Sequence, residues 1–121
     1  MNYESTNLIV SSINPTVRFV VYKMSFGRRL ELMNRVREFG TRLEFLKAGA
    51  TQQDHVEAGV LSAEIDRLYL MWGLKAVEGL HIDGEEADAE ALVRSGPEDL
   101  FLEALGHVKR SCALTDAEAK N

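Results

Sequence analysis

The sequence predicts a mainly α-helical fold, in which an N-terminal β-hairpin is followed by an antiparallel αα-hairpin and a C-terminal helical segment. Two long stretches repeat apolar residues at spacings of three and four, which is the helical period. A third stretch near the N-terminus is rich in Val, Ile, Phe and Tyr and is interrupted by a turn. The 121 residues, 45% hydrophobic and 27% charged, suit one globular domain with one core.

We expect the single domain, 1–121, to begin with a β-hairpin arm over residues 1–24. Residues 8–13 and 17–24 read as strands, and Asn14-Pro15-Thr16 between them has turn chemistry. Val17, Phe19 and Val21 alternate with other residues and would form one apolar face. Because a two-stranded hairpin is marginal alone, it should pack on helices or join a partner's sheet.

Residues 25–79 are predicted to form the helical hairpin. Ser25 can cap a first helix that ends before Gly49, and Thr51 can cap a second helix that runs to about residue 78. Gly79 would stop the second helix. The short connection makes the two helices antiparallel neighbours, and the second helix should be most buried after Leu68, where it is apolar nearly all round.

Residues 80–112 should supply a turn and the C-terminal helices, and residues 113–121 a tail. An Asp-Gly turn lies in residues 80–85, a short helix is expected near 88–95, and Gly96-Pro97 begins a helix to about Cys112. In the tail, Thr115 and Glu118 have the spacing of a capping box, so a further helix would start there.

Charge is unevenly distributed along the chain. Residues 1–50 carry a net charge of +4 and residues 51–121 a net charge of −9, which gives −5 in all. The asymmetry has two interpretations. The oppositely charged surfaces of two copies could attract each other, so that copies assemble head to tail as a homo-oligomer, or the charges of the two halves could pair within one monomer. The acidic balance and the glutamates interleaved with the arginines do not favour nucleic-acid binding.

No pattern in the sequence indicates catalysis. There is no glycine-rich phosphate loop, no histidine pair at helical spacing and only one cysteine, Cys112. The acidic run over residues 83–90 lacks the ligand spacing of a calcium loop. Glu103 and His107 are four apart and would pair on a helix surface. We therefore expect no catalytic residues, cofactor, metal or small-molecule substrate, no membrane span and no secretion signal, hence a cytoplasmic protein.

Protein–protein contact is the remaining type of site. One apolar face of the second helix is a candidate partner-binding surface, formed by Leu61, Ile65, Leu68 and Trp72. Basic side chains beside the apolar stripe of the first helix are further candidates, namely Arg28, Arg35 and Arg42. The sequence leaves open which apolar stripe is buried inside the monomer and which faces a partner.

Four segments together resemble a known family. They are residues 24–32 (MSFGRRLEL), 72–85 (WGLKAVEGLHIDGE), 96–100 (GPEDL) and 114–121 (LTDAEAKN). From about residue 17 to the end, the chain resembles the tail assembly chaperones of long-tailed, non-contractile bacteriophages and prophages. None of these segments is a catalytic fingerprint.

The resemblance implies a mostly helical, self-associating protein of the host cytoplasm. It would bind the tape measure protein, an extended helical scaffold with apolar stripes, keep it soluble, and give way as tail tube protein polymerises. Short and long forms made by ribosomal slippage are also implied. Two other functions stay open: a structural virion protein of the tail completion or terminator type, and a small phage inhibitor of a bacterial defence enzyme whose acidic surface mimics nucleic acid.

Overall fold

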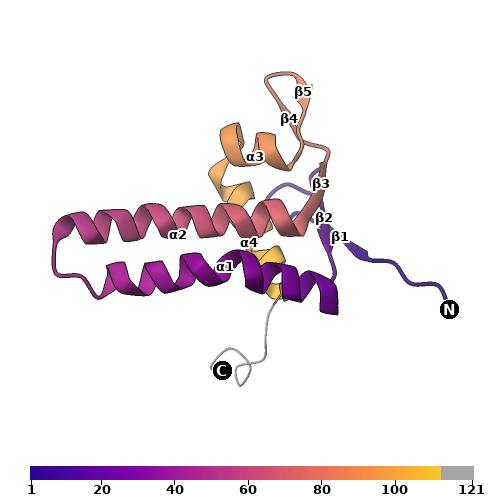
Figure 1. Ribbon diagram of the computed structural model, residues 1–121. Coiled ribbons are helices and arrows are strands. Elements are labelled where there is room, and N and C mark those ends of the chain that lie inside the picture. The colour runs from indigo at the N-terminus through magenta and orange to yellow at the C-terminus, as the bar shows by residue number, and fades with distance from the viewer. Residues whose placement is uncertain (113–121) are drawn as a thin grey trace.

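The computed structural model describes residues 1–112 and confirms a mainly helical fold with an N-terminal β-hairpin followed by two long helices (Figure 1). The elements, in chain order, are β1 (Thr6–Val10), β2 (Arg18–Tyr22), α1 (Phe26–Lys47), α2 (Gln52–Gly73), β3 (Leu74–Glu78), β4 (His81–Ile82), β5 (Glu85–Glu86), α3 (Ala89–Ser95) and α4 (Glu98–Cys112). The helix start predicted at Thr115 and Glu118, and the rest of the tail, lie outside the described residues.

The long helices begin where the capping residues predict. The Ser25 hydroxyl accepts a hydrogen bond from the Arg28 backbone N–H (3.3 Å), and the Thr51 hydroxyl accepts one from Asp54 N–H (3.1 Å). Each bond satisfies a backbone donor that the first helical turn leaves without a partner. Helices α1 and α2 form an antiparallel hairpin whose closed end projects away from the sheet (Figure 1).

The predicted extent of the helical hairpin, 25–79, is wrong at its C-terminal end. Helix α2 stops at Gly73, and the chain passes without a loop into β3, which pairs antiparallel with β2. Phe19 lies opposite Val77, so both side chains are buried on the same face. Pairing with β2 and burial of Leu74 and Val77 outweigh the helical preference that the sequence pattern suggests.

The third strand also corrects the prediction of a two-stranded arm over residues 1–24. The sheet order is β1-β2-β3, so β2 is hydrogen-bonded on both sides. Val17, Phe19 and Val21 are each at most 1% exposed, as their alternation predicts. Strand β1 ends at Val10, earlier than expected, because Ser11 begins the connection to β2.

The main core lies where one face of the sheet meets the C-terminal end of α2 and helices α3 and α4. Its buried members are Val17, Phe19, Val21, Leu70, Leu74, Val77, Ala89, Leu92, Leu100, Ala104, Leu105 and Val108. A smaller cluster of Leu46, Ala58 and Leu61 holds α1 against α2. Helix α2 therefore contributes to both cores.

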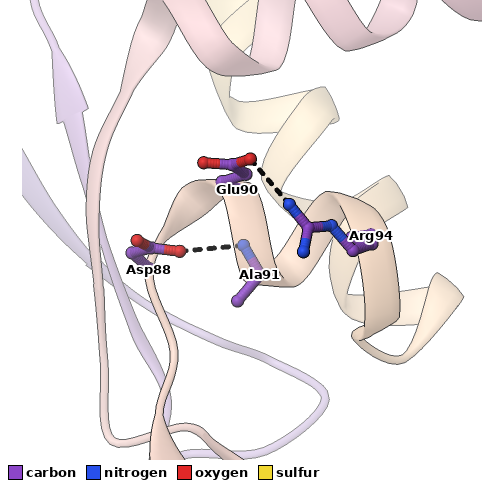
Figure 2. Close-up of polar contacts among 4 residues, drawn as sticks. All are labelled: Asp88, Glu90, Ala91 and Arg94. Atoms are coloured by element: carbon purple, nitrogen blue, oxygen red, sulfur yellow. Dashed lines mark hydrogen bonds and ion pairs between the residues drawn. The ribbon is translucent and has the colours of Figure 1, made fainter.

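Helix α3 follows a tight hairpin and is fixed by local polar contacts. Asp83 and Gly84 both have positive φ (53° and 83°), as a two-residue turn between β4 and β5 requires. The Asp88 carboxylate accepts a hydrogen bond from the Ala91 N–H (2.8 Å), and Glu90 pairs with Arg94 one turn on (Figure 2). These contacts stabilise the short helix itself, and its buried residues Ala89 and Leu92 pack it into the main core, to which α2 contributes Leu70.

At the C-terminal end of α2, helix α4 approaches so closely that there is no space for a side chain at Gly73. A Cβ there would collide with one methyl group of buried Val108 and approach the other to 3.1 Å. We predict that Gly73→Ala lowers the free energy of unfolding by about 1–3 kcal/mol, because α2 or α4 must shift. Chemical denaturation measures this loss.

Gly59→Ala is the matched control on the same helix, since nothing lies within 4 Å of a Cβ at Gly59. It should raise stability by up to about 1 kcal/mol through helix propensity. Equal effects of the two substitutions would contradict the close approach of α2 and α4.

Candidate partner-binding surface

The predicted partner-binding face of α2 lies against α1. Leu61 is 5% exposed in the smaller core, where partly buried Ile65 also packs. Leu68 is partly buried and shares this face by helical spacing. As the chain is folded here, a partner reaches this face only if α1 and α2 separate, and its role in partner binding stays a prediction.

Trp72, the fourth predicted contact, is buried and stacks with Arg28, the first of the predicted basic contacts. The Arg28 guanidinium carbon lies 4.0 Å from the Tyr22 ring centroid and 4.3 Å from the Trp72 ring centroid. The same guanidinium donates a hydrogen bond to the Trp72 carbonyl oxygen. Arg28 therefore joins the start of α1 to β2 and to the end of α2 through a cation–π sandwich.

The other two predicted basic contacts lie on the α1–α2 hairpin. Arg35 is exposed and pairs with Glu31 one turn earlier (2.7 Å). Arg42 is exposed and borders a small hollow of about 260 Å³ between α1 and α2, together with Glu57 and Glu64. The structure therefore does not bring Arg28, Arg35 and Arg42 together with Leu61 as one open surface.

An exposed apolar surface lies on the opposite side of α2, and sequence reasoning missed it. Val56, Val60, Ala63 and Met71 recur at helical spacing and are exposed, Val56 and Val60 to 59% and 57%. We call these four residues the α2 outer face. Their spacing is visible in the sequence, but the face is less apolar than the one that packs on α1.

The α2 outer face leads into a groove of about 670 Å³ between α2 and the α3–α4 region. The apolar side chains that line the groove are Val60, Ala63, Leu92, Val93, Phe101 and Leu102. The charged side chains are Glu64, Asp66, Arg67 and Glu98. Leu102 is 55% exposed, although it is a large apolar residue at the groove. This apolar concavity with charged neighbours has the composition of a helix-binding site.

Helix α1 carries a second exposed apolar surface near its N-terminus. Phe26, Leu30 and Met33 follow the i, i+4, i+7 spacing and are 85%, 51% and 59% exposed. We call these three residues the α1 stripe. It lies on a different side of α1 from Leu32 and Leu46, which are buried.

A polar cluster ties the β1–β2 connection to α4. The Ser11 hydroxyl donates to one carboxylate oxygen of Glu103 (2.5 Å), and the Ser12 N–H and hydroxyl donate to the other (2.7 Å each). The predicted pair of Glu103 and His107 does not form in the described structure: the His107 ring lies against Phe19, with ring centroids 6.0 Å apart, and its Nδ1 lies 2.7 Å from a guanidinium nitrogen of Arg110. Because Ser11 and Ser12 both donate to Glu103 directly, we interpret the cluster as structural: it holds the β1–β2 connection against α4.

Titratable side chains of α4 have shifted pKa values. Burial acts to raise the pKa of Glu103, but the hydrogen bonds from Ser11 and Ser12 outweigh it and lower that pKa. Burial, followed by the charge of Arg110, lowers the pKa of His107. Burial raises the pKa of Cys112 to about 11, so its thiol is a weak nucleophile at neutral pH.

Comparisons with protein-family models, with curated proteins and with solved structures give no match to this chain. Within residues 1–112, no helix is long and apolar enough to cross a membrane. The same residues contain no group of three or more His, Cys, Asp or Glu side chains that could hold a metal ion. We therefore argue the function from the groove, the α2 outer face and the α1 stripe.

Arg28 should stabilise the fold, unlike Arg35. We predict that Arg28→Ala lowers the free energy of unfolding by about 1–3 kcal/mol, because two ring contacts and a hydrogen bond are lost. Arg35→Ala, which removes an exposed ion pair on the same helix, should cost about 0.5 kcal/mol or less. Urea denaturation of the two variants distinguishes them, and similar losses would argue against the sandwich.

The Glu103 cluster predicts a pH dependence of stability. The pKa of Glu103 is lower in the folded state, so its contribution is present above the usual value of 4.5 and is lost as pH falls through the folded pKa. Wild-type protein should exceed Glu103→Gln in stability at neutral pH, and the difference should shrink below pH 4.5.

Thermal unfolding of both proteins across pH measures this difference. Glu38→Gln, at an exposed position on α1, is the control and should leave the wild-type profile unchanged. A Glu103→Gln difference that stayed constant with pH would show that the carboxylate charge is not responsible.

Proposed function

We propose that this protein is a phage tail assembly chaperone that binds helical segments of the tape measure protein and keeps them soluble during tail assembly. The observation that carries the proposal is the groove between α2 and the α3–α4 region, which adjoins the α2 outer face. Together they offer an apolar track along α2 that exposed Arg67 interrupts between Ala63 and Met71.

The chemistry of the track fits an amphipathic helix. Residues 56 to 71 of α2 span about 22 Å, or four turns, so a client helix of similar length can lie along it. Client side chains at i, i+3 or i+4 and i+7 would contact Val60, Phe101 and Leu102, while polar client residues stay in water. Covering a client's apolar stripe in this way removes the surface through which client chains aggregate.

Release is as necessary to a chaperone as binding. The groove is open at the protein surface, and charged side chains lie among its apolar ones. The electrostatic part of the attraction between groove and client is therefore screened by salt. A contact of this kind is reversible, and tail tube protein can displace the chaperone as it polymerises around the tape measure protein. The host cytoplasm is the compartment in which these steps would occur.

A structural virion role is the second candidate, and strand β1 favours it. In the described sheet, β1 pairs only with β2, and Leu8 and Val10 are exposed to 60% and 55%. An apolar strand edge of this kind can accept a strand from a neighbouring subunit. In that case the protein would be present in purified particles at fixed copy number.

Client solubility tests the proposal directly. Co-expression with the tape measure protein of the same phage should keep that protein in the soluble fraction. Val60→Asp should abolish this effect without unfolding the chaperone, because it places a charge in the groove at an exposed position. The soluble fraction and the circular dichroism spectrum of each variant are the measurements.

Two further variants make the result specific. Leu8→Asp, at an equally exposed position on β1, should leave client solubility unchanged. Ile65→Asp should unfold the hairpin, because Ile65 packs between α1 and α2. Loss of client solubility with Leu8→Asp but not with Val60→Asp would refute the groove as the client site and favour the sheet edge.

A further inference from the structure

The α1 stripe needs an explanation that client binding in the groove does not supply. Phe26, Leu30 and Met33 expose three large apolar side chains over two turns of one helix. Single exposed apolar residues are common, but three that recur on one side of a helix form a contact surface. The stripe and the groove belong to different sides of the molecule, since α2 lies between α1 and α3 (Figure 1).

The charges beside the α1 stripe are basic. Arg29 and Arg37 flank it in sequence, and Glu31, the one acid from residue 26 to residue 37, pairs with Arg35. The groove has the opposite balance, because Glu64 and Glu98 line it with Arg67, and its third acid, Asp66, pairs with Lys109. The α1 stripe, which is apolar with basic neighbours, is therefore complementary to the groove, which is apolar with acidic neighbours.

We propose that α1 of a second copy occupies the groove when no client is bound, with its α1 stripe against Phe101 and Leu102. The inference rests on the proposed function only for the statement that the groove is also the client site. Self-association then covers the client-binding surface, and a client helix and a second copy are alternative occupants of one groove.

The arrangement cannot close within one chain, because a copy's own α1 packs against the other side of α2. The stripe of one copy must therefore enter the groove of another. Such a contact joins two different surfaces, so a pair of copies keeps one open groove on one copy and one open stripe on the other, and further copies can add head to tail. The mean size of the assembly should grow with protein concentration and shrink with added salt.

Two substitutions, each in an exposed side chain, separate the two surfaces. Met33→Asp damages the stripe and leaves the groove intact, whereas Leu102→Asp damages the groove and leaves the stripe intact. Sedimentation velocity and light scattering of the purified full chain give the mass of each variant alone and of their equimolar mixture. No client is present, so the result is independent of the client-solubility experiment.

We expect the wild-type protein to exceed the 13.5 kDa monomer mass increasingly as concentration rises. Each variant alone should remain a monomer. The mixture should give a dimer that grows no further, because the intact stripe of one variant enters the intact groove of the other. Phe45→Asp, at a 78% exposed position of α1 outside the stripe, should assemble like wild type.

Three results would overturn the inference. The first is a wild-type protein that stays monomeric up to millimolar concentration. The second is self-association that survives both Met33→Asp and Leu102→Asp, which would point to another interface such as β1. The third is a mixture of the two variants that remains monomeric while each retains the wild-type circular dichroism spectrum.

Discussion

The direct passage from helix α2 into strand β3 is the constraint on which the rest of the structure depends. No loop separates Gly73 from Leu74, so the direction of α2 is fixed by the pairing of β3 with β2. Gly73 lets Val108 of α4 approach the α2 backbone, and Leu70 is fully buried one turn earlier. The sheet, α2 and α4 are consequently held as one unit, from which the α1–α2 hairpin projects.

Helix α2 is covered by α1 on one side and by α3 and α4 on another, and a third side remains exposed. Toward α1, helix α2 places Ala58 and Leu61 in the smaller core, and near its C-terminus it packs into the main core. Between the contacts with α1 and those with α3 and α4, the α2 outer face stays open and leads into the groove. The proposed binding surface is thus a consequence of where the two cores lie, and Arg28 keeps α1 in place on the covered side.

Local sequence signals predicted the helix starts, because a cap acts through its own first turn, as Ser25 and Thr51 do. They could not predict β3, whose strand conformation depends on a partner more than 50 residues earlier in the chain. The exposure of the candidate surface could not be predicted for a related reason. Periodicity identifies apolar faces without saying which neighbour covers them, so it predicts the most apolar face of α2, with Leu61 and Ile65, as the partner-binding surface although this face packs on α1. The weaker stripe of Val56 and Val60 is the exposed one.

Site-specific photo-crosslinking tests most directly the claim that the groove holds a helix of the tape measure protein. A photoreactive amino acid replaces Val93, which lines the groove, or Leu8, which is exposed on β1, in protein co-expressed with the tape measure protein. We predict a crosslink to the tape measure protein from position 93 and none from position 8. A crosslink from position 8 alone, or from neither position while the client stays soluble, would contradict the assignment of the groove as the client site.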